Sequence, residues 1–357
     1  MPDQPLRVVL FHKDFEPHRG GGGTARHIHG LASALVDNGC VVRVAAGSPE
    51  IIKTPYETFP IVKASDMQQH IAWADVAHIH GARSILAFQG ARLSKRGGVP
   101  FFYTPHCWYN PRSFANMVAK FIWDQTAERF LLTRCARTII LTDFWRDYLR
   151  KHFMPSGRTI VVPNCVLKRD LKIATRRSSA THGPVSILSV GRVSPEKRGR
   201  DVIAALAQPG LETATLNIAG RGSDRAALEA LAQQLGVADR VKFLGFVTDE
   251  DLSALVAMSD VFVLASEEEG LPTILLEMIL ARIPIVCTRI PGNLAITDIV
   301  GVSTTYDVGD IPKLAELLAR PEPITDRMMQ AVESNFIWER VAPKILQLYR
   351  ASLAAAK

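Results

Sequence analysis

The sequence of 357 residues has no hydrophobic run of the length that crosses a lipid bilayer. A membrane-spanning helix needs about 20 consecutive apolar residues, and the apolar stretches here, such as "LRVVLF" near the start, are much shorter. No small-residue cleavage site follows this first stretch, so we interpret it as a β-strand and not as a signal peptide. We expect a cytoplasmic protein that is at most peripheral on the inner face of a membrane.

Cysteine is scarce and follows no pattern. Disulfide frameworks and zinc ribbons need paired, regularly spaced cysteines. The five cysteines here form no C-x-x-C pair and are odd in number: Cys40, Cys107, Cys135, Cys165 and Cys287. We therefore expect buried free thiols in a reducing compartment.

Several signatures of nucleotide and nucleic-acid binding are also missing. The chain has no G-x-x-x-x-G-K-[ST] loop and no clean G-x-G-x-x-G with an acid after the next strand, which argues against P-loop and nicotinamide sites. It has neither a helix-turn-helix pattern nor a basic cluster interleaved with aromatic residues. We expect no nucleic-acid partner.

Charge is unevenly distributed along the chain. Residues 1–180 carry 25 Lys and Arg against 13 Asp and Glu, a net charge of +12, whereas residues 181–357 carry 17 against 22, a net charge of −5. The basic half indicates an anionic acceptor or an anionic membrane surface. An ordinary solvated surface is the alternative.

Short apolar runs alternate with longer amphipathic segments throughout the chain. Apolar runs without polar alternation are typical of strands buried on both faces, and their alternation with helices is typical of βαβ units with parallel sheets. The predicted strands lie at residues 6–11, 41–46, 75–80, 100–103, 137–141, 158–162, 185–190, 214–219, 240–245, 260–265 and 283–287. We predict an α/β fold with two doubly wound, Rossmann-like domains.

The series of strands restarts after the polar stretch "RRSSATHGP" at residues 176–184. A polar segment that ends in Gly-Pro is typical of a linker. We therefore place the two domains at residues 1–178 and 179–337, facing a cleft, with a final helix at residues 338–357.

Four glycines precede the first predicted helix, in "RGGGGTARHIHGL". Glycine lets the backbone approach a ligand closely, and a helix N-terminus offers unpaired N–H groups. Gly22 and Gly23 are therefore candidates for a diphosphate cradle, and a flexible turn is the alternative.

Two cations follow a predicted strand in "SVGRVSPEKRGRDV". Arg192 and Lys197 come just after the carboxyl end of that strand, where open α/β sheets bind their ligands. A guanidinium and an ammonium suit a diphosphate, although a solvated loop would also contain such charges.

The stretch "SEEEGLPTILLEMILARIPIV" begins at another strand end. Glu269 precedes a Gly-Leu-Pro turn and a helix start, where Pro is favourable. Glu277 lies inside the apolar part of that helix, where an acid is tolerable if it faces a cleft or an exposed side. We interpret Glu267 and Glu268 as solvated neighbours.

Histidines and acids also offer metal ligands. His78 and His80 lie on one face of a predicted strand but have no evident third ligand, so a metal site is weakly supported. His106 follows another strand and is a candidate site residue. Residues 249–251, Asp-Glu-Asp, follow Thr248 and are explained as a helix start, so we expect no metal.

These fragments, in this order, resemble one family. The chain is similar from end to end to the retaining glycosyltransferases of family 4, which have the GT-B fold with an E-x7-E motif. The resemblance is carried by "GGTARHIHGLASAL", "DVAHIHG", "TPH", "VVPNCV", "GRVSPEK", "IAGRGSDRAALEALAQQLGVADRVKFLGFV" and "EGLPTILLEMILARIPIV".

The resemblance implies roles for residues of the second half. Arg192 and Lys197 would hold the diphosphate of a nucleotide-sugar donor. Glu269 would bind hydroxyl groups of the donor sugar, with the backbone N–H groups of Gly270 and Leu271 nearby.

Further roles are implied by the resemblance. Glu277 would accept hydrogen bonds from the ribose, Gly22 and Gly23 would close over the diphosphate, and His106 would contact the donor sugar. The first domain would bind the acceptor, and the final helix would pack back on that domain.

The implied activity is retaining transfer of a hexose from a UDP- or GDP-sugar to a glycan, glycolipid or lipid-linked acceptor, without a cofactor or metal, in bacterial polysaccharide or glycoconjugate synthesis. A small-molecule acceptor is an alternative. A sugar-nucleotide epimerase or phosphorylase of the same fold, and a non-catalytic binding module, are the competing classes.

Overall fold

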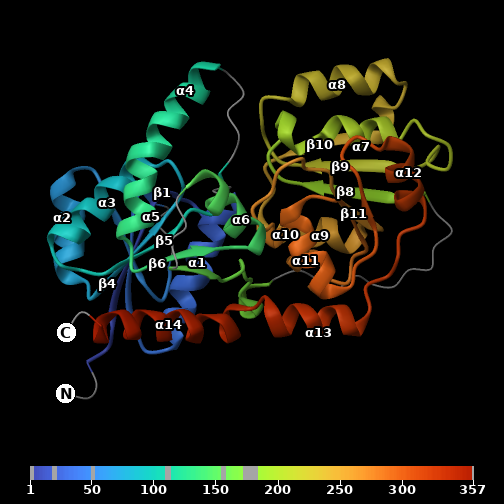
Figure 1. Ribbon diagram of the computed structural model, residues 1–357. Coiled ribbons are helices and arrows are strands. Elements are labelled where there is room, and N and C mark those ends of the chain that lie inside the picture. Colours follow the sequence, from blue (N-terminus) through green and yellow to red (C-terminus); the bar gives the residue numbers. More distant parts are fainter. Residues whose placement is uncertain are drawn as a thin grey trace. The chain divides into compact units, whose positions relative to one another are not determined.

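The structure is a computed structural model that describes residues 4–17, 22–49, 53–108, 114–153, 158–171 and 184–355. The chain divides into two compact units (Figure 1). Unit 1 comprises Met1–Leu167 together with Ile337–Lys357, and unit 2 comprises Lys168–Phe336. The predicted boundary between residues 178 and 179 lies outside the described residues.

Unit 1 is built on a parallel sheet with the order β3-β2-β1-β4-β5-β6-β7. Its strands are β1 (Arg7–Phe15), β2 (Val41–Pro49), β3 (Glu57–Pro60), β4 (Val76–His80), β5 (Phe101–Thr104), β6 (Arg137–Ile140) and β7 (Thr159–Val161). All strands predicted for this half are confirmed. The edge strand β3 was not predicted, because half-exposed residues in "ETFP" give no apolar run.

Helices cover both faces of this sheet. They are α1 (Gly22–Asp37), α2 (Ala64–Trp73), α3 (Ile85–Arg96), α4 (Phe114–Trp123), the π-helix η1 (Asp124–Glu128), α5 (Arg129–Arg134), α6 (Asp143–His152) and α14 (Trp338–Ala354). Val8 and Leu10 share a buried cluster with side chains of α1 and α14, whereas Phe11 and Ile79 lie against Gly90 of α3. Because side chains alternate along a strand, the residues of one strand pack into the two hydrophobic cores on opposite faces of the sheet.

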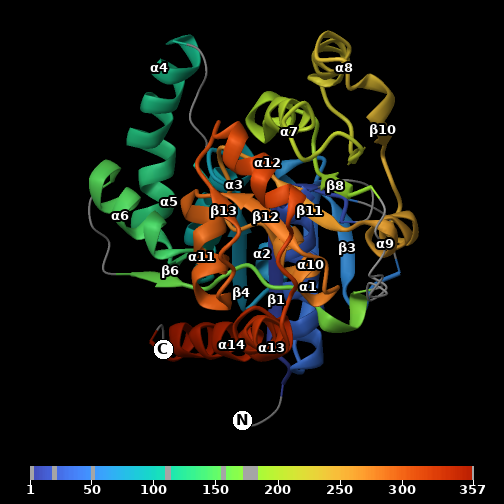
Figure 2. The ribbon, with the colours of Figure 1, turned by 90° about the vertical axis from the view of Figure 1, so that its right-hand side faces the viewer.

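The final helix belongs to unit 1. The backbone N–H of Trp338 donates to the carbonyl of Val166 at 3.0 Å, next to a parallel bridge between Val166 and Ile337. Both views in Figures 1 and 2 show α14 alongside α1, which it contacts. Gly30 of α1 makes this packing close, because a Cβ there would lie 2.2 Å from the indole of Trp338.

Unit 2 repeats the architecture with the parallel order β10-β9-β8-β11-β12-β13. Its strands are β8 (Ser186–Val190), β9 (Thr215–Ala219), β10 (Val241–Gly245), β11 (Val261–Leu264), β12 (Ile285–Thr288) and β13 (Thr305–Tyr306). The predicted strands are confirmed, and β13 is an additional short edge strand.

The helical segments of unit 2 are α7 (Gly199–Ala205), α8 (Arg225–Gln234), α9 (Asp249–Met258), α10 (Thr273–Leu280), α11 (Pro291–Val300), α12 (Ile311–Ala319) and α13 (Asp326–Asn335), with the 3-10 turns η2 (Lys168–Asp170), η3 (Pro195–Lys197) and η4 (Ala238–Arg240). Thr248 caps α9, and its hydroxyl accepts from the N–H of Asp251 at 3.1 Å. The acids of residues 249–251 therefore form a helix start, as predicted.

The strand order locates the ligand-binding edge of each sheet. Open α/β sheets bind ligands outside the carboxyl ends of strands where the order reverses. In unit 2 this switch point lies between β8 and β11, and in unit 1 between β1 and β4. The five cysteines are all buried free thiols, as predicted.

Candidate functional site

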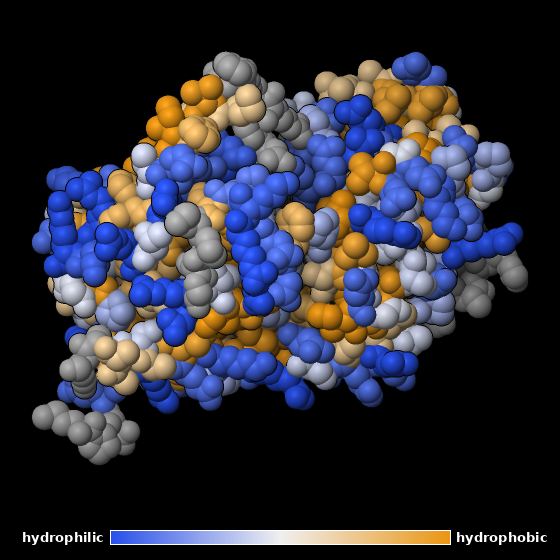
Figure 3. All heavy atoms as spheres, viewed as in Figure 1, coloured by the Kyte–Doolittle hydropathy of each residue, from blue (hydrophilic) through white to orange (hydrophobic). Residues whose placement is uncertain are grey.

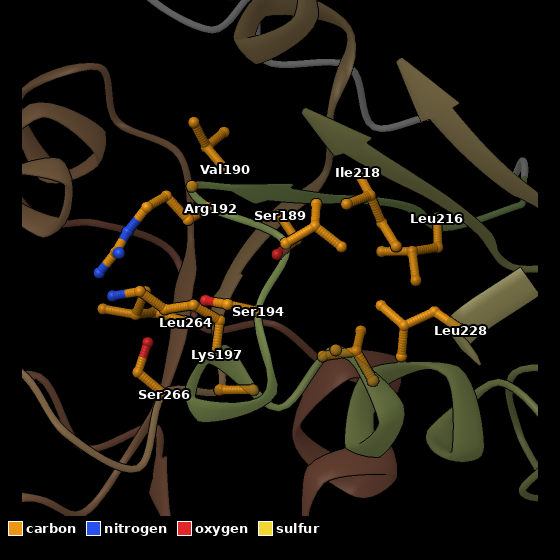
Figure 4. A pocket seen from close by; sticks show the side chains of 15 residues that line it. Ser189, Val190, Arg192, Ser194, Lys197, Leu216, Ile218, Leu228, Leu264 and Ser266 are labelled. Atoms are coloured by element: carbon orange, nitrogen blue, oxygen red, sulfur yellow. The ribbon is translucent and has the colours of Figure 1, made fainter. Parts of the chain in front are cut away.

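A pocket lies at the switch point of unit 2. It is lined by Ser189, Val190, Gly191, Arg192, Val193, Ser194, Lys197, Gly199, Val202, Leu216, Ile218, Leu228, Leu264, Ala265 and Ser266. Figure 4 shows Arg192, Lys197 and Ser266 together at one end, while Leu216, Ile218 and Leu228 line the other. The sequence-predicted cations therefore lie at a pocket with one polar and one apolar end.

Three glycines let two loops pack backbone against backbone beneath this pocket. Gly191 adopts a φ of +146°, which favours glycine. A Cβ on Gly220 would lie 1.7 Å from the carbonyl oxygen of Gly191, and one on Gly222 would lie 1.9 Å from that of Val193. The loop that carries Arg192 is thus fixed by the loop after β9.

The two cations of this loop differ in their surroundings. Arg192 is 66% exposed, and its guanidinium lies 3.7 Å from the carboxylate of Glu196. Lys197 is 22% exposed and closes the short turn η3, after Pro195. Arg192 is therefore free to reorient toward an anion, whereas Lys197 is held in place.

Lys197 is held by Glu269, for which the family resemblance implies a contact with another part of the donor. The Nζ of Lys197 lies 2.5 Å from the Oε1 of Glu269, which is 11% exposed. The hydroxyl of Ser266 donates to the same oxygen at 2.7 Å. The loops after β8 and β11 thus meet in a hydrogen-bonded cluster of an ammonium, a carboxylate and a hydroxyl.

A set of residues that the sequence did not reveal supports Glu269. A Cβ on Gly292, in the first turn of α11, would lie 2.3 Å from the carbonyl oxygen of Glu269. The hydroxyl of Thr288 donates to the carbonyl of Ser266 at 2.5 Å, and the amide of Asn293 donates to Thr288 at 2.9 Å. The sequence gives one indication of this support. Pro-Gly-Asn follows a buried strand, which indicates that a helix begins there and that its first turn can pack closely against a neighbouring backbone.

The side chain of Glu267 is 38% exposed, so it is partly solvated as expected, but it also makes contacts that the sequence did not indicate. Its carboxylate lies 3.4 Å from the guanidinium of Arg198, which is also paired with Asp201 at 2.6 Å. Its backbone N–H donates to the carbonyl of Glu196 at 2.9 Å. Arg198 adopts a φ of +49°, so this contact ties a strained turn after β8 to the loop after β11. Glu268 also takes part in an interaction.

The helix α10 begins at Thr273, directly after its N-cap Pro272. Glu277 lies in this helix and is 5% exposed, and it has an interaction partner. Gly270 is partly exposed and Leu271 is buried. Glu277 therefore does not lie on an exposed helix face, which excludes one of the two explanations for an acid in this apolar segment.

Gly22 opens α1 of unit 1. It adopts a φ of +72°, and neither Gly22 nor Gly23 has an atom within 4 Å of the place where a Cβ would be. Both glycines are exposed. The helix N-terminus predicted for a diphosphate is thus accessible, whereas the two glycines before it lie outside the described residues.

Buried histidines gather at the carboxyl ends of β4 and β5. The Nδ1 of His80 and the Nε2 of His106 are 3.1 Å apart, and His106 adopts a φ of +66°. His27, from α1, stacks edge-on against His106 with ring centroids 4.7 Å apart. His78 packs against His80 with ring centroids 4.2 Å apart, but its own ring nitrogens have other partners. It is bonded to Tyr349 of α14 at 2.6 Å and to the hydroxyl of Thr104 at 2.8 Å.

Burial makes these histidines neutral. It lowers the pKa of His27 to about 3, and the pKa values of His80 and His106 are well below the ordinary value. Desolvation is the main cause for each ring, with neighbouring imidazoles as a smaller one. His106 is therefore a neutral imidazole at physiological pH.

A buried carboxylate lies in the π-helix η1, which directly follows α4. Glu128 of the π-helix is fully buried, and it accepts hydrogen bonds from the hydroxyl of Tyr103 at 2.5 Å and from the indole of Trp108 at 2.9 Å. The backbone N–H of Arg83 donates to its other oxygen at 3.1 Å. Burial raises the pKa of Glu128, although these hydrogen bonds oppose that effect.

Two protein-family models match the chain. A model of glycosyltransferase family 4 matches residues 21–167, and a model of group 1 glycosyl transferases matches residues 172–318. Together the two matches span most of both units.

Known proteins with similar sequences are glycosyltransferases. The chain is 23% identical over 312 residues to the GPI3 subunit of phosphatidylinositol N-acetylglucosaminyltransferase from Saccharomyces cerevisiae, covering 83% of this chain and 67% of that protein. It is 28% identical over 271 residues to 2-deoxystreptamine glucosyltransferase from Streptomyces kanamyceticus, covering 71% and 68%. It is 26% identical over 410 residues to glycogen synthase from Mycobacterium tuberculosis, covering 97% and 95%.

Solved structures show the same fold over nearly the whole chain. Sucrose-phosphate synthase from Thermosynechococcus elongatus has a TM-score of 0.78 at 19% identity, covering 98% of this chain and 100% of that one. HepE from Anabaena, in complex with UDP and glucose, has a TM-score of 0.78 at 17% identity, covering 97% and 100%. With two parallel-sheet domains of this order and matches to both family models, the chain has the GT-B fold and belongs to glycosyltransferase family 4.

Proposed function

We propose that the protein is a retaining glycosyltransferase that moves a hexose from a UDP- or GDP-sugar to a glycan, glycolipid or lipid-linked acceptor in bacterial polysaccharide or glycoconjugate synthesis. One observation carries the donor assignment. Lys197, Glu269 and Ser266 meet at the carboxyl ends of β8 and β11, beside a pocket with Arg192 at its polar end. This is the edge of the sheet where such folds bind nucleotides.

The charges of this cluster suit a departing nucleoside diphosphate. Cleavage of the bond between sugar and phosphate builds negative charge on the β-phosphate. Fixed cations stabilise that charge more in the transition state than in the bound donor. Lys197 is already held in position, and Arg192 is free to turn toward the phosphates. Because two cations supply this charge, the proposal requires no metal ion at the diphosphate.

The same cluster offers acceptors for sugar hydroxyl groups. Glu269 has a second carboxylate oxygen besides the one that binds Lys197 and Ser266. We assign Glu269 to the hexose, with the N–H groups of Gly270 and Leu271, and the buried Glu277 to the ribose. The roles of Gly22, Gly23 and His106 rest on their places in the sequence and on the family resemblance.

Relatives support two acceptor classes. The phosphatidylinositol N-acetylglucosaminyltransferase is named for a lipid, and WaaG, which has a TM-score of 0.64 at 21% identity, is described as involved in lipopolysaccharide biosynthesis. The 2-deoxystreptamine glucosyltransferase carries the name of a small molecule. We favour the lipid-linked class, because unit 1 has a surface suited to a membrane.

This surface lies on α4 and α6. Four large apolar side chains of α4 are between 45% and 64% exposed: Met117, Val118, Phe121 and Ile122. Figure 3 shows hydrophobic atoms gathered at the α4 end of unit 1. The pKa of His152, at the end of α6, is lowered by burial and then by the charges of Lys151 and Lys120, so cations of both helices lie near each other. Apolar side chains flanked by cations suit an anionic membrane.

No helix of the described residues is long and apolar enough to cross a membrane. The proposed association is therefore peripheral, through the exposed side chains of α4 and the cations beside them.

Turnover of donor without an acceptor tests the proposed reaction. The protein is incubated with a panel of UDP- and GDP-hexoses, and the released sugar is followed by proton NMR. A retaining enzyme first releases the anomer that the donor contained. We expect Arg192→Ala and Lys197→Ala each to lower the rate by about 10²–10³-fold.

Lys242→Ala is the matched control for this assay, because Lys242 is an exposed cation on β10 of the same unit. Its rate should equal that of the unmodified protein. Initial release of the opposite anomer would overturn the retaining assignment, and equal rates in all three variants would overturn the donor site.

A further inference from the structure

Three histidines from separate segments converge inside unit 1. His27 comes from α1, His80 ends β4, and His106 follows β5. One ring nitrogen of each lies within 4.8 Å of the corresponding nitrogens of the other two, and all three residues are buried. The sequence pattern had pointed to His78 and His80 instead, and it offered no third ligand.

The rings are spaced as they are around one tetrahedral ion. Their centroids are 4.7 Å apart for His27 and His106, 5.5 Å for His27 and His80, and 5.3 Å for His80 and His106. Three imidazoles that bind one zinc ion at about 2.0–2.1 Å have centroids roughly 5 Å apart. His80 Nδ1 and His106 Nε2 are hydrogen-bonded to each other at 3.1 Å, and this separation is close to the roughly 3.3 Å expected for two ligands of one zinc ion, which would replace that hydrogen bond.

The cluster also contains polar atoms that the protein itself does not satisfy. Neither ring nitrogen of His27 has a hydrogen-bond partner, nor has the Nε2 of His80. Asn164 lies near His27 and opposes the lowering of its pKa. A buried polar group without a partner destabilises the fold, so the ring of His27, with both nitrogens unpartnered, calls for a ligand.

The chemistry of these rings fits a metal ion. All three imidazoles are buried with one nitrogen of each close to the other two, and imidazole nitrogen is a common zinc ligand. Imidazole nitrogen suits zinc and its neighbours in the first transition row, whereas magnesium and calcium prefer oxygen ligands. The cluster contains no carboxylate that would favour the latter ions.

We propose that His27, His80 and His106 bind one divalent transition-metal ion, preferably zinc, inside unit 1. The ion would join α1 to the ends of β4 and β5, and it would fix the ring of His106, whose backbone has a φ of +66°. Three protein ligands leave a fourth position for water. The site goes beyond the proposed transfer reaction and does not depend on it.

The hydrogen-bond partners of the three rings determine the metal affinity that we expect of this site. A metal-bound histidine normally donates its second N–H to a carboxylate, carbonyl or water, and loss of such a partner lowers affinity by about 10–100-fold. His80 Nε2 and the second nitrogen of His27 have no protein partner. We therefore expect weaker binding than at a fully supported structural zinc site. Coordination through the Nε2 of His106 leaves its Nδ1 for a donor hydroxyl, so the two roles are compatible.

Metal uptake by the full chain tests the proposal. The protein is prepared without a histidine tag, because a tag binds the same ions, and is stripped with a chelator. Cobalt(II) is then added as a spectroscopic probe and zinc(II) as a competitor. We expect one cobalt ion per chain with the intense visible bands of four-coordinate cobalt, and their loss on addition of zinc.

His27→Gln should weaken cobalt binding by about tenfold or more, because it removes one of three ligands. His29→Gln is the matched control, since His29 lies on the same helix but pairs with Tyr56 at 2.6 Å, and it should leave the titration unchanged. Circular dichroism of the metal-free variants verifies their folding, and His80→Gln serves if His27→Gln does not fold.

Absence of four-coordinate cobalt bands in the unmodified protein would overturn the proposal. So would an undiminished titration in both His27→Gln and His80→Gln, which would show that the ion binds elsewhere. Neither outcome bears on the donor assignment, because metal content is measured without turnover.

Discussion

At the scale of single residues, the ion pair between Lys197 and Glu269 shapes the candidate site. The family resemblance implies that these side chains contact different parts of a donor, yet they are bonded to each other at 2.5 Å. The pair holds the ammonium in place before any ligand binds, which reduces the conformational entropy that binding must overcome. A bound diphosphate would then share or replace Glu269 as the partner of Lys197.

This pair makes a stability prediction. Lys197→Met should destabilise the protein by about 1–3 kcal/mol, because it leaves the largely buried carboxylate of Glu269 without its cation. Adding Glu269→Gln should recover most of this loss, since the second charge is then removed. Urea unfolding of the two single variants and the double variant gives the coupling between the sites.

The exposed pair of Lys313 and Glu316, on α12, is the control. Lys313→Met should change stability by less than about 1 kcal/mol, because solvent screens exposed ion pairs. If the losses of the two single variants at the site simply add in the double variant, the pair does not stabilise the fold.

Residues that follow a buried strand were predictable, and their supports were not. Arg192, Lys197 and Glu269 could be placed because the carboxyl ends of strands in an open sheet bind ligands. Ser266 and His27 could not, because a serine beside a strand and a histidine in an amphipathic helix are ordinary in sequence. Their roles come from long-range contacts that no local pattern encodes.

At the scale of secondary structure, α4 shows where sequence patterns fail. The central strands were predictable because they are buried on both faces and so form apolar runs. The region from Ser113 to Thr133, which contains α4, is mixed in polarity, so its sequence did not indicate which face would be buried. The structure leaves Met117, Val118, Phe121 and Ile122 exposed, and burial therefore does not explain their hydrophobicity.

We expect α4 to bind anionic membranes. The protein should co-sediment with vesicles that contain phosphatidylglycerol and much less with vesicles of phosphatidylcholine alone, and added salt should weaken the binding. The double substitution Phe121→Glu with Ile122→Glu should abolish co-sedimentation, because it places two anions in the apolar face.

Val62→Glu is the matched control, since Val62 is 79% exposed in the same unit and lies outside α4 and α6. It should leave vesicle binding intact. Equal binding of the α4 variant and the control would refute a membrane role for this helix.

At the scale of the whole molecule, two sheets of the same topology divide the chain. The restart of the strand series predicted two Rossmann-like domains, and the order in each sheet places a switch point beside the candidate residues. The return of the chain to unit 1 at Ile337 was predicted from the family resemblance alone. Local sequence could not show it, because the amphipathic pattern of a helix such as α14 does not indicate which part of the protein the helix packs against.

The central claim is that unit 2 binds a nucleotide sugar through the loops after β8 and β11. Its most direct test is thermal unfolding of the full chain with a panel of UDP- and GDP-hexoses. A donor that binds only the folded state adds about 2.7 kcal/mol at 100 times its Kd. We predict that at least one donor raises the unfolding temperature, that Lys197→Met removes this shift, and that Lys242→Met retains it. The account is contradicted if no donor shifts the unmodified protein, or if Lys197→Met shifts as much as Lys242→Met.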